Sequence, residues 1–521
     1  MSCSPPLGSP LTHTRLRTPA ATARVSGMCS VCTSDCDGTC EIGLSAVRGA
    51  EAVNPHAPDT QQFASEKTYP LDLSHFNING RVFGVWGAPP DARKATFPEV
   101  DLQSRFGLQS PRPLSAPFLL PALAKLNWED YFSGAALAGV VAVIGEDVVA
   151  KDKGLLMHAG RVRQAPLIAA MVEAFKRYDR GVGAIVLQAN PDDEEKGVLE
   201  WAIEALGIRA VELKFGQAAK GIQGYSQVPR LEDARRFRDM GYLVLPDPTL
   251  PEVVERYQRG EGPVFQKIGK LPLWTEEHLV ARVGELRRLG AEQICFKTGP
   301  FAPEDLVRIL RIASEHEVDL VTLDGAGGGT GHSPVRMMHE WGLPPVELAV
   351  LVQRVLDAWR KEGRALPPIA LAGGYALEDQ VFKGLCLAAP HVSLIALGRA
   401  SMTAAMVGAR LGRSLKDGKG VPPAFERFGA SREELFADQR LLRTWYGADA
   451  EQVPTGAVGV FSYLNRVSCG LRQLMALNRR FKLSELRRED LLPLTDTAAG
   501  ISGIPSIMDR VGAAIEATRS L

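Results

Sequence analysis

Eight short apolar runs, separated by amphipathic stretches of helical length, dominate the chain between about residue 116 and residue 415. The runs are APFLLPAL, VVAVIGED, AIVLQAN, AVELKF, QICFKTG, DLVTLDG, PIALAGG and SLIALGRA, and stretches such as VLEWAIEAL and PEDLVRILRIASEH lie between them. Continuously apolar strands that alternate with helices are typical of a parallel sheet buried on both faces. Eight such units over about 300 residues predict an α/β fold, a (β/α)8 TIM barrel.

The spacing of the runs also predicts how the chain is organised. About 80 residues separate Leu213 from Cys295, with an extra apolar piece at VFQKIGK, so we expect an insertion there. We divide the chain into four segments: a flexible N-terminus with a cysteine motif (1–50), a linker packed on the barrel (51–115), the barrel (116–415) and a C-terminal helical cap (416–521).

Composition excludes two classes of partner. Sixty basic residues balance sixty acidic ones among 521, so no net charge would attract nucleic acid. The most apolar run, Ala135 to Ile144, is far shorter than the roughly 20 residues that cross a bilayer. Residues 1–27 lack acidic residues and favour a disordered extension over a targeting peptide. We expect a cytoplasmic protein that binds neither nucleic acid nor membrane and is compatible with a homo-oligomer.

Glycines follow three consecutive strands at their expected carboxyl ends. The sixth run continues into DGAGGGTGHSP (Asp324 to Pro334), in which five residues are Gly. The seventh ends in Gly373-Gly374, and the eighth in Gly398-Arg399. In such barrels the loops after strands seven and eight often hold a phosphate on backbone N–H groups. The pattern favours a phosphate-bearing cofactor over tight packing.

Two lysines lie near the ends of neighbouring strands. Lys214 lies in AVELKFGQAAKG, with Gln217 and Lys220 just beyond it, and Lys297 lies in QICFKTG. An isolated lysine at a strand end usually extends to solvent. Two that end adjacent barrel strands would instead converge on the barrel mouth, where they can stabilise negative charge or bind a carboxylate.

Four of the eight cysteines fall within twelve residues, at Cys29, Cys32, Cys36 and Cys40. Their spacing, C-x2-C-x3-C-x3-C, can surround one cluster of several irons. Structural zinc sites usually use two CxxC-like pairs separated by a longer loop, and a disulfide requires an oxidising compartment. The motif therefore favours a 4Fe–4S iron–sulfur cluster over zinc, and zinc over a disulfide.

Five stretches around the strand ends resemble the flavin (synthase) domain of glutamate synthase. DGAGGGTGHSP is similar to the family's GHDGGTGASP, and ELKFGQAAKG is similar to its KxxQGAKPG. FKTG resembles SVKL, LAGGYALEDQVFKGLCLAA resembles ADGGLRTGxDVxxAxxLGA, and GAALAGVVAVIGED resembles the strand that ends in the GEGG loop. The resemblance covers about 300 of the 521 residues in the family's order.

The resemblance implies a cofactor and a set of site residues. FMN, held non-covalently, is expected rather than FAD, because no GxGxxG follows a predicted strand. The residues assigned to the cofactor are Lys214, Lys297, Asp324, Gly327, Gly328, Gly329, Thr330, Gly373, Gly374, Gly398 and Arg399. Those assigned to catalysis are Lys220, Gln217 and Glu146.

The function that follows is reductive amination of 2-oxoglutarate, in which 2-iminoglutarate becomes glutamate, or conversion of a closely related imine. Ammonia would be free or derived from glutamine, and electrons would come from ferredoxin or a reductase subunit through the N-terminal cluster. Three departures keep other interpretations open: no glutaminase domain is expected, Lys220 is followed by GIQGYS instead of a second GEGG, and SMTAAMVGARLG replaces the cysteine-rich stretch after strand eight. The alternatives are a different amino-acid or imine substrate, and an electron-transfer subunit of a larger complex.

Overall fold

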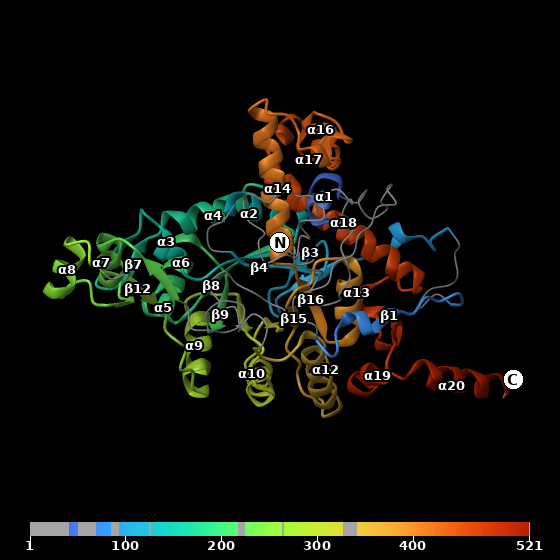
Figure 1. Cartoon of the computed structure of the whole chain (residues 1–521). Coiled ribbons are helices and arrows are strands. Elements are labelled where there is room, and N and C mark those ends of the chain that lie inside the picture. The colour runs from blue at the N-terminus through green and yellow to red at the C-terminus, as the bar shows by residue number, and fades with distance from the viewer. Residues whose placement is uncertain are drawn as a thin grey trace.

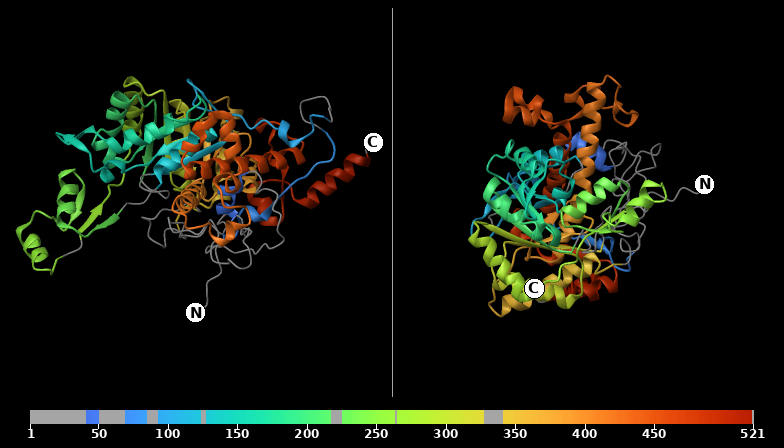
Figure 2. Two further views of the ribbon diagram at one scale, coloured as in Figure 1. Left: turned by 90° about the horizontal axis from the view of Figure 1, so that it is seen from above. Right: turned by 90° about the vertical axis from the view of Figure 1, so that its left-hand side faces the viewer.

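A computed structural model describes residues 41–49, 69–84, 93–123, 127–216, 225–262, 265–326 and 341–519 of the chain. Its centre is one closed barrel of parallel strands surrounded by helices (Figure 1). Further segments extend the barrel on two sides, an insertion at one side and the C-terminal helix α20 (Ile507–Arg519) at the other (Figure 2).

The barrel closes in chain order, each strand pairing in parallel with the next. Its strands are β4 (Phe118–Leu123), β5 (Val141–Ile144), β8 (Ala184–Ala189), β9 (Ala210–Phe215), β13 (Gln293–Thr298), β14 (Leu320–Asp324), β15 (Ile369–Ala372) and β16 (Val392–Ala396). Seven of them lie within predicted runs, β16 begins one residue before its run, and the predicted (β/α)8 barrel is confirmed.

One helix packs outside the barrel after each strand, as the amphipathic stretches predict. In chain order these are α2 (Trp128–Ala138), α4 (Pro166–Lys176), α6 (Val198–Leu206), α9 (Glu276–Arg288), α10 (Pro303–Glu315), α12 (Pro345–Lys361), α13 (Glu378–Leu387) and α14 (Arg399–Lys416). Short elements accompany two of the connections: α3 (Val148–Lys151), β6 (Leu156–His158), β7 (Arg161–Gln164) and α5 (Pro191–Glu195).

Alternation along each strand separates two apolar cores. On β9, Val211, Leu213 and Phe215 join the large core between the strands and the helices. Ala210 belongs instead to the core inside the barrel, with Val141, Val143, Val186, Cys295, Leu320, Ala370 and Leu394 from other strands. Because side chains alternate along a strand, Glu212 and Lys214 share the interior face with Ala210.

A hairpin fills the N-terminal end of the barrel. Strands β2 (Ser104–Phe106) and β3 (Arg112–Leu114) pair antiparallel, and their buried Phe106 and Leu114 belong to the interior core. The side-chain amide of Gln293, at the start of β13, donates to the carbonyl of Ser110 at 2.7 Å in the hairpin turn. Only the C-terminal end of the strands is then left for chemistry, as in other barrels of this type.

The expected insertion between β9 and β13 is a small sheet with its own helices. The strands β10 (Tyr225–Val228), β12 (Phe265–Ile268) and β11 (Leu243–Leu245) pair antiparallel in that order, with α7 (Leu231–Asp239) and α8 (Pro251–Gln258) beside them. A separate apolar cluster that includes Val228, Tyr242 and Phe265 holds this unit together. It extends from the barrel on the left of Figure 1.

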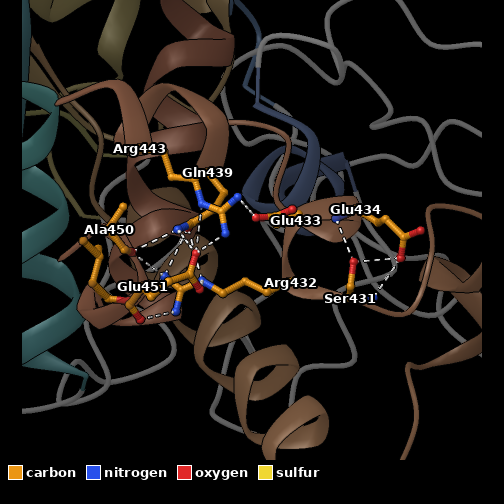
Figure 3. A network of polar contacts seen from close by, with 9 residues as sticks. Ser431, Arg432, Glu433, Glu434, Gln439, Arg443, Ala450 and Glu451 are labelled. Carbon is orange, nitrogen blue, oxygen red and sulfur yellow. Dashed lines mark hydrogen bonds and ion pairs between the residues drawn. The ribbon is translucent and has the colours of Figure 1, made fainter. Parts of the chain in front are cut away.

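The C-terminal region is helical, with a two-stranded sheet of β1 (Phe76–Ile78) and β17 (Leu491–Pro493). The long α18 (Thr455–Leu477) packs against α14, α2, α13 and α1 (Glu41–Arg48). The remaining helices are α15 (Pro423–Glu426), α16 (Arg432–Leu435), α17 (Gln439–Tyr446), α19 (Asp496–Ser502) and α20. Figure 3 shows Arg432 tying α16 to the turn after α17, where it donates to the carbonyls of Glu451 at 2.9 Å and Ala450 at 3.2 Å.

None of the described helices combines the length and the apolar character needed to cross a membrane.

Candidate functional site

Lys214 and Lys297 lie side by side near the C-terminal end of the barrel strands. They are direct register partners on the adjacent strands β9 and β13, and both are only 4% exposed. Buried lysines are rare without a partner, because an unpaired ammonium loses its hydration. The sequence predicted that these two lysines would converge on the mouth, and their register places them together.

Each of the two lysines is paired with a carboxylate from a different strand end. Lys214 Nζ donates to Glu146 Oε1 at 2.5 Å, and Lys297 Nζ donates to Asp324 Oδ2 at 2.8 Å. Glu146 follows β5, and Asp324 is the last residue of β14. Burial works to raise the pKa of Glu146, but the charge and hydrogen bond of Lys214 hold that pKa below its usual value. Four predicted site residues thus meet as two ion pairs.

A third carboxyl group, Glu212, lies one layer deeper in the barrel. It precedes Lys214 by two residues on the same face of β9 and is 2% exposed. Its side chain accepts a hydrogen bond from the amide of Gln188 on β8. Burial raises the pKa of Glu212 above its usual value, although the nearby charge of Lys297 acts in the opposite direction. Sequence reasoning missed Glu212, yet its spacing from Lys214 was the available signal.

The glycines after β15 allow two strand ends to touch through their backbones. Gly373 and Gly374 have φ values of 122° and 117°, in the region that favours glycine. A Cβ on Gly373 would lie 2.8 Å from the backbone nitrogen of Gly325, and that nitrogen donates to Ala372 O at 2.9 Å. The close approach brings the ends of β14 and β15 together beside Asp324.

Gly398 and Arg399 form the N-terminus of α14, an 18-residue helix. Gly398 is the N-cap residue, and a Cβ there would lie 3.2 Å from Pro121 Cγ at the end of β4. The first N–H groups of a helix lack partners within it, and the helix dipole favours an anion at that end. This strand end can therefore hold a phosphate on backbone amides, with the charge of Arg399 close by.

These residues fit a phosphate-bearing flavin. The buried Asp324 Oδ1 has no hydrogen-bond partner within the part of the chain that the structure describes, so it can accept a donor from a ligand. Lysine charge, glycine-lined strand ends and a helix N-terminus surround the same end of the barrel. A flavin needs these features: donors for its phosphate and positive charge near its ring.

Several predicted site residues lie outside the described residues. They are Gln217, Lys220, Gly327, Gly328, Gly329, Thr330, and the four cysteines Cys29, Cys32, Cys36 and Cys40. Among the residues that are described, no group of three or more His, Cys, Asp or Glu side chains is placed to hold a metal ion.

A second polar cluster lies beside the mouth and joins the insertion to the barrel. Asp147, the residue after Glu146, faces Lys267 of β12 at 3.4 Å and Tyr242 Oη at 3.5 Å. The ammonium groups of Lys196 and Lys267 lie 3.8 and 3.9 Å from the centre of the Tyr242 ring. Sequence reasoning missed this cluster, because its members come from four distant segments.

Two surface cavities among the described residues lie at the opposite end of the barrel from the lysines. They measure about 560 and 280 Å³ and are lined by residues such as Ser314, Glu317 and Ala365. Both adjoin the loops that precede β14 and β15, so neither belongs to the lysine end.

Comparison with known proteins identifies part of the barrel. Residues 271–409 match the family described as a conserved region in glutamate synthase. This stretch contains Lys297, Asp324, Gly373 and Gly398. No curated protein matches the chain in sequence.

Among solved structures, the chain is similar to a mutant of the active chimera of (S)-mandelate dehydrogenase, with 14% identity, 81% of this chain and 88% of that chain covered, and a TM-score of 0.43. It is also similar to an oxidised active mutant of (S)-mandelate dehydrogenase, with 14% identity, the same coverage and a TM-score of 0.42. Over residues 271–409, which contain the four barrel strands β13 to β16, the chain is similar to the glutamate synthase family.

Proposed function

We propose that this chain is an FMN-dependent oxidoreductase that reduces an imine to an amine, with 2-iminoglutarate, formed from 2-oxoglutarate and ammonia, as the first candidate substrate. The reaction adds two electrons and two protons to the carbon–nitrogen double bond. The observation that carries the proposal is the buried Lys297–Asp324 pair beside the glycine-lined strand ends, within the matched segment 271–409.

The charged side chains have distinct parts in this proposal. Lys297 and Lys214 would place two positive charges at the mouth, where negative charge develops on a reduced ring or arrives with a substrate carboxylate. Glu146 and Asp324 keep those charges paired in the barrel. Gly398, Arg399 and the first N–H groups of α14 would hold the phosphate. Bound FMN would supply the hydride that reduces the imine carbon.

The electron route completes the proposal. Cys29, Cys32, Cys36 and Cys40 would hold an iron–sulfur cluster that receives electrons from ferredoxin or a reductase subunit. Such a cluster fits a reducing compartment such as the cytoplasm. The ammonia would be free or come from a glutaminase on a separate protein.

The ultraviolet–visible spectrum of anaerobically purified protein tests the cofactors together. We expect flavin bands with a released flavin that co-elutes with FMN, and an iron–sulfur absorbance. Release of FAD, or the absence of flavin, would refute the flavin site. Changing both Cys32 and Cys36 to Ser should remove iron and keep the flavin, whereas Cys469→Ser on α18 should keep both. Stoichiometric zinc without iron would refute the electron route.

A second candidate substrate follows from one sequence feature. Lys220 is followed by GIQGYS, where the family has a second GEGG, so another amino acid or imine is the alternative to 2-oxoglutarate. Turnover with reduced ferredoxin, 2-oxoglutarate and ammonia or glutamine distinguishes these substrates, and no turnover with any imine favours an electron-transfer subunit. Lys220→Met should leave the flavin spectrum intact and raise the substrate KM.

A further inference from the structure

Glu212 is the most deeply enclosed carboxyl group beneath the two lysines. On β9 it is the register partner of Cys295 on β13 and of Gln188 on β8. Among the described residues, the amide of Gln188 is the group that hydrogen-bonds to it. The proposed function assigns Glu212 no part, although it lies directly under the proposed site.

The charges of the two ion pairs above Glu212 balance each other without it. Lys214 is paired with Glu146, and Lys297 is paired with Asp324, each through a direct contact. Two ammonium groups and two carboxylates therefore sum to zero. If Glu212 is ionised, these five side chains together carry one unit of negative charge, and if it is protonated they are neutral.

The groups that face Glu212 come from every neighbouring strand. Lys297 on β13 and Lys214 on its own strand favour the ionised form, and so does the amide of Gln188 on β8. Glu146 opposes ionisation, and burial opposes it most, so the pKa of Glu212 is raised. Cys295 contributes no charge, because burial raises the pKa of its thiol well above the usual value.

We propose that Glu212 is a positioning residue that sets the charge of the lysine end of the barrel: by binding or releasing one proton beneath Lys214 and Lys297, it decides how strongly these lysines attract an anionic ligand. The proposal rests on the proposed function in that FMN is the anion. It requires no group other than a proton from solvent. The neutral form strengthens anion binding, and the ionised form weakens it.

The test compares FMN binding by the wild type and by Glu212→Gln across pH, using quenching of flavin fluorescence by the apoprotein. At the acidic end the two proteins should bind equally, because Glu212 is neutral in both. As pH rises, the wild-type Kd should increase by roughly tenfold relative to that of the variant, since one buried charge appears only in the wild type. Glu212→Asp keeps an ionisable group and should restore the pH dependence.

Two further variants separate this role from a merely structural one. Gln188→Leu removes the hydrogen bond that favours the ionised carboxylate, so the rise in Kd should move to higher pH. Asp319→Asn is the matched control: Asp319 is also a buried carboxyl whose pKa burial raises, but it lies at the start of β14 and accepts from Leu108 N and Ile294 N, at the other end of the barrel. Its loss should leave the pH profile of FMN binding unchanged.

A readout without flavin is the free energy of unfolding of the apoprotein. Because the pKa of Glu212 is higher in the folded state, its contribution to stability is lost as pH rises through that pKa, and Glu212→Gln should lack this loss. Parallel pH profiles of Kd for the wild type and Glu212→Gln would overturn the inference and leave the proposed function standing. A wild type that binds no FMN would instead overturn the proposed function, and parallel unfolding profiles would then overturn the inference too. If Glu212→Gln does not fold, an unshifted profile for Gln188→Leu would overturn the inference in its place.

Discussion

Buried ion pairs occur in two regions of this molecule, and they are built differently. In the C-terminal region, Arg480 and Asp490 are 1% and 0% exposed and share three N–O contacts of 2.8–3.1 Å. Asp490 Oδ2 also accepts from the backbone of Arg487 at 2.9 Å. At the barrel mouth, Lys297 and Asp324 share one contact of 2.8 Å, and Asp324 Oδ1 has no partner among the described residues.

The difference suggests separate roles: the Arg480–Asp490 pair stabilises the fold, and the Lys297–Asp324 pair can also bind a ligand. A guanidinium and a carboxylate that share several N–O contacts hold each other in one rigid geometry. A lysine is a compact charge with rotatable donors, and a carboxylate with a spare oxygen can accept another hydrogen bond. Both oxygens of Asp490 are engaged, whereas Asp324 keeps one oxygen without a hydrogen-bond partner among the described residues.

The largest expected effect is on the C-terminal pair. Asp490→Ala leaves Arg480 buried without its carboxylate, which should lower the free energy of unfolding by about 3–5 kcal/mol. Urea denaturation measures this change. Glu516→Ala is the control, because its pair with Arg519 is exposed and should contribute less than about 1 kcal/mol. A loss below about 1 kcal/mol for Asp490→Ala would mean that the two regions do not differ as described.

Lys297→Met should act on binding more than on folding. The positive charge beside the proposed flavin is lost and Asp324 is left unpaired, so FMN affinity should fall by about 10- to 150-fold and the midpoint potential should decrease. Fluorescence titration and redox titration measure the two effects. Lys383→Met is the matched control, because Lys383 is also a buried lysine but donates to Leu73 O, far from the mouth. Equal FMN affinity in both variants would contradict the site.

Gly373→Ala should weaken FMN binding by about tenfold, because its Cβ would force the ends of β14 and β15 apart. Gly363→Ala provides the comparison. Gly363 also has a positive φ, 72°, but a Cβ there meets nothing within 4 Å. That control should cost about 1 kcal/mol of stability through backbone strain and leave FMN binding unchanged. Similar FMN affinities for both variants would show that the contact between the strand ends does not shape the site.

A last effect concerns pH and Asp193, which accepts a hydrogen bond from the backbone of Asp147 in the cluster that joins the insertion to the barrel. Burial, together with the charge of Asp147, raises the pKa of Asp193 to about 7. A carboxyl group whose folded pKa is raised loses its contribution to stability as pH rises, here between about pH 4 and 7. Asp193→Asn should lack this loss, and its stability relative to the wild type should rise by about 1.4 kcal/mol for each unit of the pKa shift. Urea denaturation at several pH values measures it.

The surface variant Asp417→Asn should follow the wild-type pH profile, since Asp417 lies in an exposed pair with Lys419. A wild-type stability that does not fall between pH 4 and 7 relative to Asp193→Asn would show that Asp193 is ionised throughout.

Sequence predicted the barrel better than it predicted the electrostatics inside it. Apolar runs such as VAVI of β5 identify a strand without knowledge of its neighbours, because burial on both faces leaves no other pattern. Strand ends also identify Lys214, Lys297 and Asp324, since parallel strands finish at one end of the barrel. Glu212 was missed, although it precedes Lys214 by two residues and therefore lies on the same face of the strand.

Hydrophobic periodicity in the sequence does not predict ion pairs and hydrogen bonds between distant segments. Asp147, Tyr242 and Lys267 meet only after the insertion folds against the barrel. Arg480 and Asp490 lie close in sequence, but nothing in their spacing indicates that both are buried. Tertiary packing, which local pattern does not encode, decides these contacts.

The hairpin of β2 and β3 closes the N-terminal end of the barrel. Among the described residues, the C-terminal end of the strands is therefore the entrance for a molecule that binds above Glu212. A product would leave through the same opening. In the proposed route the N-terminal cluster carries the electrons, and a cluster that approached the flavin through this opening would compete with a small substrate for the space. We expect the electron carrier and the substrate to reach the flavin one after the other, with the electrons held on the flavin in between. Steady-state kinetics should then show a double-displacement pattern.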